Sequence, residues 1–307
     1  MKVHQKLEDI PGITCRRPDI SGRHTTLGIG GTVAMSIRAN SREALTAVLR
    51  ALRSQGRPHV ILGGGSNIVF PENAPDLVLV LNGSRGIRRI DSHRIAVMSG
   101  ETNLALMAWC AGNGAAGLEF LAGIPGTVGG ATAVNAGAFG RDMAASFLEA
   151  QILDPDGVET RVAPDACGFR YRDSIFKRGD AVLLEIILSV VPDEPAEVRR
   201  RIRGHFAYRR RNHPEKNART AGCFFKNPGR TREKTAGRLI DAAGLRGLRR
   251  QSLEVSSRHA NFIVHHGGAG MTDLQQFIDH IAAAVQKAGG PRLEREVLFV
   301  APDGGRY

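Results

Sequence analysis

Residues 117–140 read GLEFLAGIPGTVGGATAVNAGAFG, and this stretch decides the fold. Seven of its residues are glycine, and only Glu119 carries a charge. Glycine inside a helix or strand costs roughly 0.5–1 kcal/mol relative to alanine, so the stretch predicts neither a stable helix nor a strand interior. Glycine instead permits close approach of the backbone to another chain segment or to a flat ligand. A packed turn in a core is one interpretation, but the length of the run favours a cradle for a large cofactor.

A second glycine-rich loop follows a short apolar segment, Val60-Ile61-Leu62, which is typical of a strand. The loop is Gly63-Gly64-Gly65-Ser66-Asn67, whose backbone N–H groups can converge on one point and suit a pyrophosphate. A tight strand-to-helix turn explains the same residues equally well. The loop has neither the GxGxxG spacing of a Rossmann site nor the lysine of a P-loop.

Length and composition are those of a soluble two-domain protein. The chain has 307 residues, of which 42% are hydrophobic and 23% charged. It has no apolar run long enough for a membrane span and no apolar region typical of a signal peptide, so we expect a cytoplasmic protein without a membrane partner. Its four cysteines form no CxxC pair, which predicts neither a disulfide framework nor a metal site.

The net charge of +12 is concentrated in two arginine runs, at 199–203 and 208–211. A basic run is most often a solvated helix face, but it can also bind nucleic acid or a diphosphate. Few aromatic residues accompany these runs, so stacking on single-stranded bases has little support. We therefore expect no nucleic-acid partner.

Hydrophobic spacing predicts alternating elements along the chain. Ser41 is typical of a helix cap and begins a predicted helix that continues through Leu52. Strands are predicted at 77–81 and 94–98, and a hairpin at 150–162. Beyond Pro192–Pro195 the pattern predicts a basic helix, followed by helices and strands at 236–243, 259–265, 271–288 and 296–301.

Seven motifs together resemble one family, the UDP-N-acetylenolpyruvoylglucosamine reductases, flavoenzymes of peptidoglycan synthesis. The compact C-terminal part resembles the branch that lacks an extra substrate-covering loop. The motifs occur in the family's order and are GGGSN (63–67), GLEFLAGIPGTVGGATAVNAGAFG (117–140), YRDSIFK (171–177), AGCFFKNP (221–228), AGRLIDAAGLRG (236–247), HANFIV (259–264) and LEREV (293–297).

The resemblance implies an α+β fold. Residues 1–197 would form an FAD-binding region of the vanillyl-alcohol-oxidase (PCMH) type with two subdomains that meet near residue 72, and residues 198–307 a substrate-binding domain. FAD would be bound non-covalently, with its pyrophosphate on the first loop. The implied cofactor residues are Gly63, Gly64, Gly65, Ser66, Asn67, Pro125, Gly130, Ala133 and Gly137.

The implied reaction passes a hydride from NADPH to FAD and then to the enolpyruvyl ether of UDP-N-acetylglucosamine. Arg172 and Glu296 match the family residues that polarise the substrate carboxylate, and Cys223 stands where the family often has a proton-donating serine. A thiol, with a pKa of about 8.5, is acidic enough to donate. From the residues alone, a structural ion pair with Asp173 or another acid is the commoner role for an arginine such as Arg172, Glu296 cannot be told from Glu294, and Cys223 could be an inert thiol.

The substrate's diphosphate and nucleoside require cations and an amide. The implied substrate-binding residues are Arg211, Lys226 and Asn227, each of which could also be an ordinary surface residue. The main alternative function is another FAD-dependent oxidase or dehydrogenase of the same fold. We expect the UDP-sugar and NADPH as partners and a monomeric protein.

Overall fold

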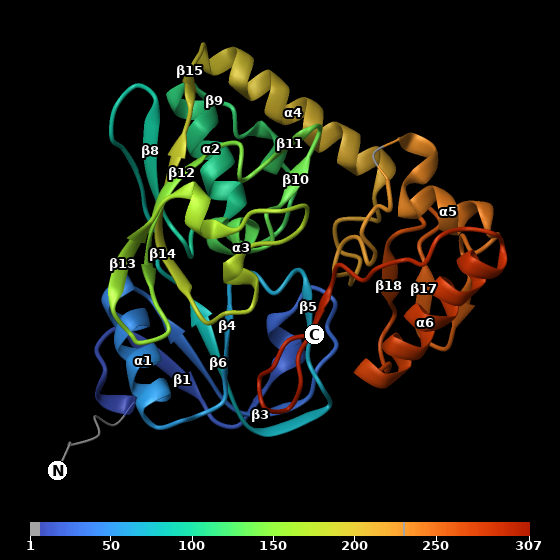
Figure 1. Ribbon diagram of the computed structural model, residues 1–307, viewed down its shortest axis with the longest axis horizontal. Helices are drawn as coiled ribbons and strands as arrows, with labels where there is room; N and C mark the ends of the chain where they lie inside the picture. Colours follow the sequence, from blue (N-terminus) through green and yellow to red (C-terminus); the bar gives the residue numbers. More distant parts are fainter. Residues whose placement is uncertain (1–6, 230) are drawn as a thin grey trace. The chain divides into compact units, whose positions relative to one another are not determined.

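The computed structural model describes residues 7–229 and 231–307, which form a mixed α+β fold (Figure 1). The chain divides into two compact units, each built from separate stretches of sequence. Unit 1 contains the described residues up to Arg17 together with Met35–Gly64 and Leu77–Ala207. Unit 2 contains Pro18–Ala34, Gly65–Asp76 and Tyr208–Tyr307.

The helices are α1 (Arg42–Ser54), α2 (Asn103–Asn113), α3 (Val128–Ala133), α4 (Pro195–Asn212), α5 (Ala236–Ala242) and α6 (Met271–Lys287). The strands of the first half of the chain are β1 (Ile13–Arg16), β2 (Asp19–Ile20), β3 (Thr32–Ala39), β4 (His59–Leu62), β5 (Ile68–Val69), β6 (Asn73–Asn82), β7 (Ile87–Arg89), β8 (Arg94–Met98), β9 (Ala115–Ala116), β10 (Gly137–Ala138), β11 (Arg141–Asp142) and β12 (Phe147–Leu153). The later strands are β13 (Glu159–Val162), β14 (Val182–Ser189), β15 (Val191–Pro192), β16 (Arg249–Arg250), β17 (Leu253–Val255), β18 (Ile263–His265) and β19 (Leu298–Phe299).

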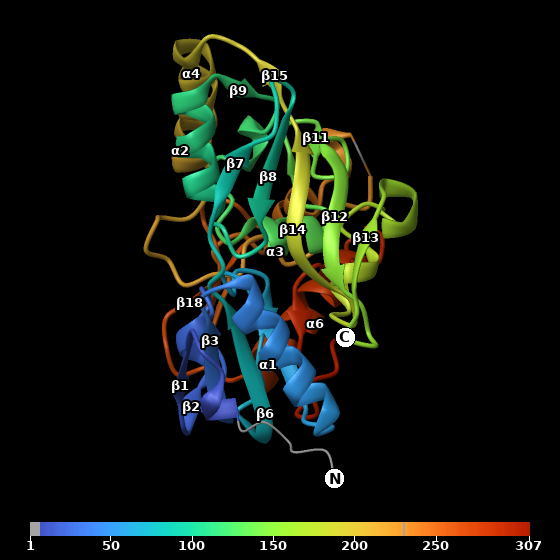
Figure 2. The same ribbon diagram turned by 90° about the vertical axis from the view of Figure 1, so that its left-hand side faces the viewer.

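The first sheet of unit 1 has the strand order β1-β3-β6-β4, and α1 packs against it (Figure 2). The predicted cap is confirmed, because Ser41 Oγ accepts a hydrogen bond from the Ala44 N–H at 3.1 Å. The apolar side chains of α1 recur at helical spacing and bury one face. The buried residues are Ala44, Leu45, Val48, Leu49 and Leu52, with Thr46 beside them.

The second sheet of unit 1 has the order β13-β12-β14-β8-β7, and all its neighbouring strands run antiparallel. The predicted hairpin is β12 and β13, with Leu153 opposite Glu159. Residues of α2, α3 and the first half of α4 pack with this sheet in one hydrophobic core. Apolar residues of the long glycine-rich stretch belong to this core, so the stretch packs against the sheet and its helices.

Unit 2 has a core of its own, formed around the antiparallel sheet β16-β17-β18 with α5 and α6. The short strands β5 and β19 pair in parallel, so that Ile68 lies opposite Leu298. This pairing brings the chain after the GGGSN loop beside the end of the LEREV segment. Local sequence patterns cannot predict such a pairing, because its two strands are far apart in the chain.

The prediction that residues 117–140 contain no helix is wrong, because α3 forms within them. Thr127 caps α3 by accepting a hydrogen bond from the Gly130 N–H at 3.2 Å. A Cβ at Gly129 would lie only 2.7 Å from the carbonyl oxygen of Ser99. Close packing that only glycine allows therefore compensates for the low helix propensity of the sequence.

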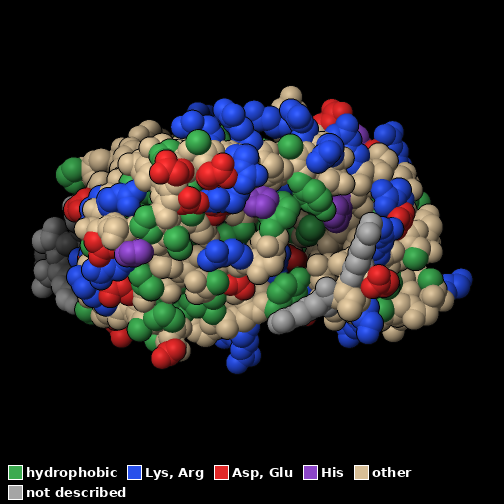
Figure 3. All heavy atoms as spheres, turned by 90° about the horizontal axis from the view of Figure 1, so that it is seen from above, with side chains coloured by type: hydrophobic (Ala, Val, Ile, Leu, Met, Phe, Trp, Pro, Cys, Tyr) green, Lys and Arg blue, Asp and Glu red, His purple; other side chains and the backbone are tan. Residues whose placement is uncertain are grey.

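The predicted basic helix is α4, which begins at Pro195. Figure 3 shows Lys and Arg side chains gathered along one margin of the face that it draws. Arg201 is partly neutralised within unit 1 by ion pairs with Glu119 at 2.9 Å and Asp193 at 2.5 Å. None of the described helices is both long enough and apolar enough to cross a membrane.

Candidate active site

The first part of the candidate site is the contact between the Gly63–Gly64 end of the GGGSN loop and the start of α3. A Cβ at Gly63 would lie 2.1 Å from Thr127 Oγ1, and one at Gly64 would lie 2.5 Å from the Cα of Gly126. Any side chain at these positions would push the two loops apart. The glycines thus serve contact between chain segments, which was the first of the two uses expected for the 117–140 stretch but was not predicted for the GGGSN loop.

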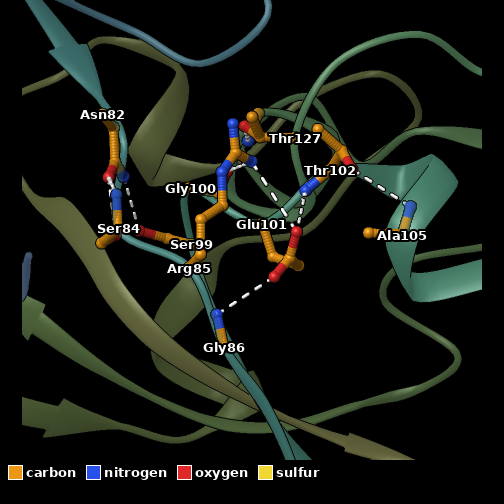
Figure 4. A network of polar contacts seen from close by, with 11 residues as sticks. Asn82, Ser84, Arg85, Gly86, Ser99, Gly100, Glu101, Thr102, Ala105 and Thr127 are labelled. Atoms are coloured by element: carbon orange, nitrogen blue, oxygen red, sulfur yellow. Dashed lines mark hydrogen bonds and ion pairs between the residues drawn. The ribbon is translucent and has the colours of Figure 1, made fainter. Parts of the chain in front are cut away.

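A buried polar network fixes the strand ends behind this contact (Figure 4). Asn82, the last residue of β6, donates from Nδ2 to Ser99 Oγ at 2.8 Å. Its Oδ1 accepts hydrogen bonds from the main-chain N–H and the hydroxyl of Ser84, at 3.0 and 2.6 Å. The carbonyl of Ser99 in turn accepts from the N–H of Gly129 in α3 at 2.8 Å. The end of the first sheet is thereby joined to the helix in the glycine-rich stretch.

Glu101 performs the same task beside it (Figure 4). Its carboxylate accepts from the N–H groups of Gly86 and Thr102, at 3.0 and 2.9 Å, and forms an ion pair with Arg85 at 3.8 Å. Its carbonyl accepts from Val128 N–H in the first turn of α3 at 2.8 Å. Because Thr102 is also the cap of α2, Glu101 holds the starts of two helices together.

The glycine loops of unit 1 fit a large planar cofactor. Gly63, Gly64, Pro125 and Gly130 are exposed although their surroundings are tightly packed. Around Gly130, an added Cβ would have only Thr127 Oγ1 within 4 Å, at 3.3 Å. The unit therefore presents a surface of bare backbone beside a capped helix start, the kind of surface that can approach a pyrophosphate and flat rings.

The rest of the GGGSN loop belongs to unit 2. Gly65 is buried with φ +59°, and a Cβ there would lie 1.9 Å from the carbonyl oxygen of His24. Ser66 and Asn67 are half-buried. Asn67 accepts a hydrogen bond from Leu298 N–H at 3.1 Å and donates from Nδ2 to the carbonyl of Glu296 at 3.5 Å. A predicted cofactor residue thus contacts a predicted catalytic residue.

Arg172 lies in unit 1, in a turn closed by main-chain hydrogen bonds between Arg170 and Asp173. The turn is attached to the glycine-rich stretch, because Ser174 Oγ donates to the carbonyl of Ala133 at 2.7 Å and Arg172 Nη2 donates to the carbonyl of Gly137 at 2.8 Å. Ala133 and Gly137, both predicted to lie near FAD, are therefore direct neighbours of the predicted catalytic turn.

Cys223 and Glu296 lie on neighbouring segments of unit 2. Glu296 N–H donates to the carbonyl of Phe224 at 2.8 Å, and both predicted catalytic side chains are half-buried. Glu294, the other candidate acid, is 72% exposed and forms an ion pair with Lys226 at 2.5 Å. The two glutamates, which sequence periodicity could not separate, thus differ in environment.

The three predicted substrate-binding residues also lie in unit 2. Lys226 is the half-buried partner of Glu294, and Asn227 is exposed and accepts a hydrogen bond from Ala236 N–H at the start of α5, at 3.0 Å. Arg211 is exposed in the last turn of α4. Lys226 and Asn227 adjoin the Cys223 segment directly, whereas Arg211 lies on a separate element.

Sequence reasoning missed two buried asparagines that hold these segments. Asn261 binds both main-chain polar groups of Phe225, and Asn135 binds the turn that carries Arg172. Both lie among apolar residues in motifs quoted above, HANFIV and the glycine-rich stretch. An asparagine in apolar surroundings was the available signal, because a buried amide needs hydrogen-bond partners.

Comparison with known families gives two matches. Residues 22–163 match the family model described as "FAD binding domain", which makes this region an FAD-binding domain, as predicted. Residues 213–300 match "UDP-N-acetylenolpyruvoylglucosamine reductase, C-terminal domain". The predicted α+β fold, with an FAD-binding region of the PCMH type and a C-terminal domain of the reductase family, is confirmed.

Whole-chain relatives extend the agreement. UDP-N-acetylenolpyruvoylglucosamine reductase 2 of Symbiobacterium thermophilum is 36% identical, over 92% of this chain and 91% of the relative. The reductase of Geotalea uraniireducens is 34% identical, over 92% of each. The crystal structure of the enzyme (MurB) from Thermus caldophilus matches with a TM-score of 0.77 and 31% identity, over 94% of this chain and 99% of that one.

A more distant structure shares the fold alone. It is 6-hydroxy-D-nicotine oxidase from Arthrobacter nicotinovorans, with a TM-score of 0.60 and 14% identity, over 94% of this chain and 88% of that one. The three full-length matches named above, each more than 30% identical, are by contrast reductases of one kind. On this evidence, the chain belongs to the UDP-N-acetylenolpyruvoylglucosamine reductase family.

Proposed function

We propose that Arg172, Glu296 and Cys223 carry out the substrate half of a flavin-dependent reduction that begins with NADPH. Family membership makes the chain a UDP-N-acetylmuramate dehydrogenase, a flavin oxidoreductase of peptidoglycan precursor synthesis. The observation that carries the residue assignment is the main-chain hydrogen bond of 2.8 Å from Glu296 to Phe224, which sets the LEREV and AGCFFKNP segments side by side.

FAD, when bound, supplies hydride transfer between NADPH and the enolpyruvyl group of the sugar nucleotide. The exposed backbone of Gly63, Gly64, Pro125 and Gly130 would hold it non-covalently, with Gly65, Ser66, Asn67, Ala133 and Gly137 nearby. Glycine backbone can approach a diphosphate closely and offer it N–H donors without the cost of burying a side-chain charge.

The side chains of this protein would stabilise the negative charge that forms on the substrate and supply the proton. Hydride addition to C3 of the enolpyruvyl group places negative charge on C2 and the carboxylate. Arg172 would bind that carboxylate, and half-buried Glu296, in its protonated form, would assist by donating a hydrogen bond to it. Cys223 would then donate a proton to C2, which completes the D-lactyl ether.

Cations beside the AGCFFKNP segment support a site for the UDP part of the substrate. Lys226, Asn227 and Arg211 would bind the diphosphate and the nucleoside, and Lys226 would exchange its exposed partner Glu294 for phosphate oxygens. A surface ion pair of this kind is worth less than about 1 kcal/mol, so the exchange is energetically easy.

The proposal also includes four finer properties. NADPH is the reductant, the protein acts as a monomer in the cytoplasm, and it belongs to the branch without the extra substrate-covering loop. The last point is supported by unit 2, where α5, β16, β17, β18 and α6 follow one another through short connections. The domain limits at residues 72 and 197 likewise stay a prediction.

An anaerobic spectroscopic experiment tests the function. The visible spectrum of the purified protein is recorded, the flavin is bleached with NADPH, and UDP-N-acetylglucosamine enolpyruvate is then added. Rapid return of the oxidised spectrum is expected, and Arg172→Ala should slow that return by about 100-fold or more while leaving bleaching by NADPH unchanged.

Each contrary result rejects a defined part of the proposal. A bleached flavin that ignores the enolpyruvate but is reoxidised by oxygen with small alcohols present would favour an oxidase of the same fold. Failure to take up FAD at all would reject the cofactor site. Normal reoxidation in Arg172→Ala would remove Arg172 from the mechanism and leave the activity in place.

A further inference from the structure

Arg172 is held by the main chain of the glycine-rich stretch. Its Nη2 donates to the carbonyl of Gly137 at 2.8 Å, and its Nη1 lies 3.4 Å from the carbonyl oxygen of Asn135. The backbone of Arg172 itself is left-handed, with φ +56°. A non-glycine residue rarely adopts this conformation unless surrounding contacts impose it.

Besides the contacts of Ser174 and Gly137 described above, the turn is held by Asn135, which is only 3% exposed. Its Nδ2 donates to the carbonyl of Arg170 at 2.9 Å, and its Oδ1 accepts from Ala144 N–H at 3.0 Å. Its own N–H donates to the carbonyl of Thr132 at the end of α3, at 3.0 Å. One residue therefore ties together the helix, the following loop and the turn that carries Arg172.

Asn135 contacts that turn at two separate points. The side-chain amide supports the turn's main chain at Arg170, and the main-chain carbonyl supports the guanidinium of Arg172. Asn135 is also left-handed, with φ +42°, a conformation that asparagine tolerates better than most residues. Glycine would adopt the left-handed conformation easily but has no side-chain amide. Most other polar residues could form hydrogen bonds but would be strained in this backbone conformation.

We propose that Asn135 is the positioning residue for Arg172, fixing the direction in which the guanidinium meets the substrate carboxylate. The inference rests on the proposed function of Arg172. Guanidinium and carboxylate pair through two parallel hydrogen bonds in a fixed fork, so binding depends on angle as well as distance. A displacement of about 1 Å in a reacting group can cost about 100-fold in rate.

The test compares the two half-reactions in Asn135→Gly, which keeps the left-handed backbone and removes the amide. Reoxidation of the reduced enzyme by UDP-N-acetylglucosamine enolpyruvate should slow by about 10- to 100-fold, while reduction by NADPH stays within about 2-fold. Asn113→Gly is the matched control, because the exposed Asn113 also donates from Nδ2 to a carbonyl, that of Trp109 at 2.9 Å. It should change neither half-reaction.

A double-variant comparison separates positioning from general stability. If Asn135 acts through Arg172, then Asn135→Gly combined with Arg172→Ala should reoxidise no more slowly than Arg172→Ala alone. Losses that multiply, or equal slowing of both half-reactions in Asn135→Gly, would overturn the inference. Asn135→Asp, which keeps the size and the Oδ1 acceptor but loses the donor, gives the same comparison should the glycine variant not fold.

Failure of the inference and of the proposed function can be told apart. Normal reoxidation in Arg172→Ala rejects the role of Arg172 and the inference with it. Slow reoxidation in Arg172→Ala with normal reoxidation in Asn135→Gly rejects the inference alone. The bound flavin spectrum, recorded for every variant, shows that each compared protein is folded and loaded.

Discussion

The side-chain amide of Asn261 binds both polar main-chain groups of Phe225. Oδ1 accepts from the Phe225 N–H at 3.0 Å, and Nδ2 donates to the Phe225 carbonyl at 2.8 Å. Asn261 is 2% exposed, and its own carbonyl accepts from Phe224 N–H at 2.9 Å. The segment that follows Cys223 is thus held as if by a neighbouring strand, although no continuous ladder is present there.

Asn261→Ala should destabilise the protein by about 2–4 kcal/mol, because it leaves a donor and an acceptor buried without partners. Thermal unfolding followed by circular dichroism measures the loss. Asn261→Asp keeps one of the two bonds but loses the donor, so it should also be less stable than the wild type. Unfolding temperatures equal to that of the wild type in both variants would contradict this structural role of Asn261.

Gly31→Ala should destabilise the protein by about 2 kcal/mol or more. A Cβ at Gly31 would lie 1.7 Å from the main-chain oxygen of Glu72, so the backbone must shift. Gly112→Ala in α2 is the control, because an added Cβ there meets nothing within 4 Å. It should leave stability unchanged or raise it by up to about 1 kcal/mol, and chemical denaturation distinguishes the two.

Stability should fall when the pH is lowered from 6.5 towards 4. Burial, reinforced by the positive charges of Arg209 and His259, lowers the pKa of His213 to about 4, and burial also lowers the pKa of His259. The unfolded chain therefore binds more protons than the folded one in this range, so acid favours unfolding. The two rings pack with Phe262, at centroid distances of 4.9 Å each.

His213→Phe tests this cause, because it keeps a ring against Phe262 but cannot be protonated. Between pH 6.5 and 5 the variant should lose about 1 kcal/mol less of its free energy of unfolding than the wild type does. This value is reduced because solvent still reaches the ring of His213 and screens its charge. His93→Gln, at an exposed position, should lose as much stability as the wild type. An acid response of His213→Phe identical to that of the wild type would show that another group is responsible.

Cys223→Ser should change the alkaline side of the pH profile for reoxidation by the enolpyruvate substrate. A thiol donor is lost as it ionises, near pH 8.5 for an unperturbed cysteine, whereas a serine hydroxyl does not ionise in this range. The descending limb expected of the wild type should therefore move to higher pH or vanish in the variant. The same limb in both proteins would argue against the thiol as donor.

Local features of the fold were predictable where the sequence pattern itself carries the cause. Ser41 and the apolar spacing that follows it predicted α1, and the pattern at 150–162 predicted the hairpin of β12 and β13. The helix α3 was not predictable, because its stability comes from packing of Gly129 against Ser99 rather than from propensity. Tertiary contact overrides propensity at such a position.

The candidate site, like the fold, was predictable only in part. Two motifs singled out Cys223 and Glu296, and the family resemblance supplied their proposed roles, but only the structure shows that their segments are neighbours. The supporting asparagines could not be assigned partners, because each binds main chain far from it in sequence: Asn261 lies 36 residues from Phe225, and Asn135 lies 35 from Arg170. Almost every residue type offers the same main-chain polar groups, so the sequence does not reveal which residue an asparagine binds through them.

The parallel pairing of β5 with β19 has a consequence for how the protein is made. Ile68 leaves the ribosome about 230 residues before its partner Leu298, an interval of roughly 10–50 s at ordinary translation rates. Val69, buried in the core of unit 2, stays without its strand partner Phe299 for the same time. Because unit 2 takes residues from three separate stretches of the chain, the last of which ends at Tyr307, its core can be completed only when synthesis is nearly finished.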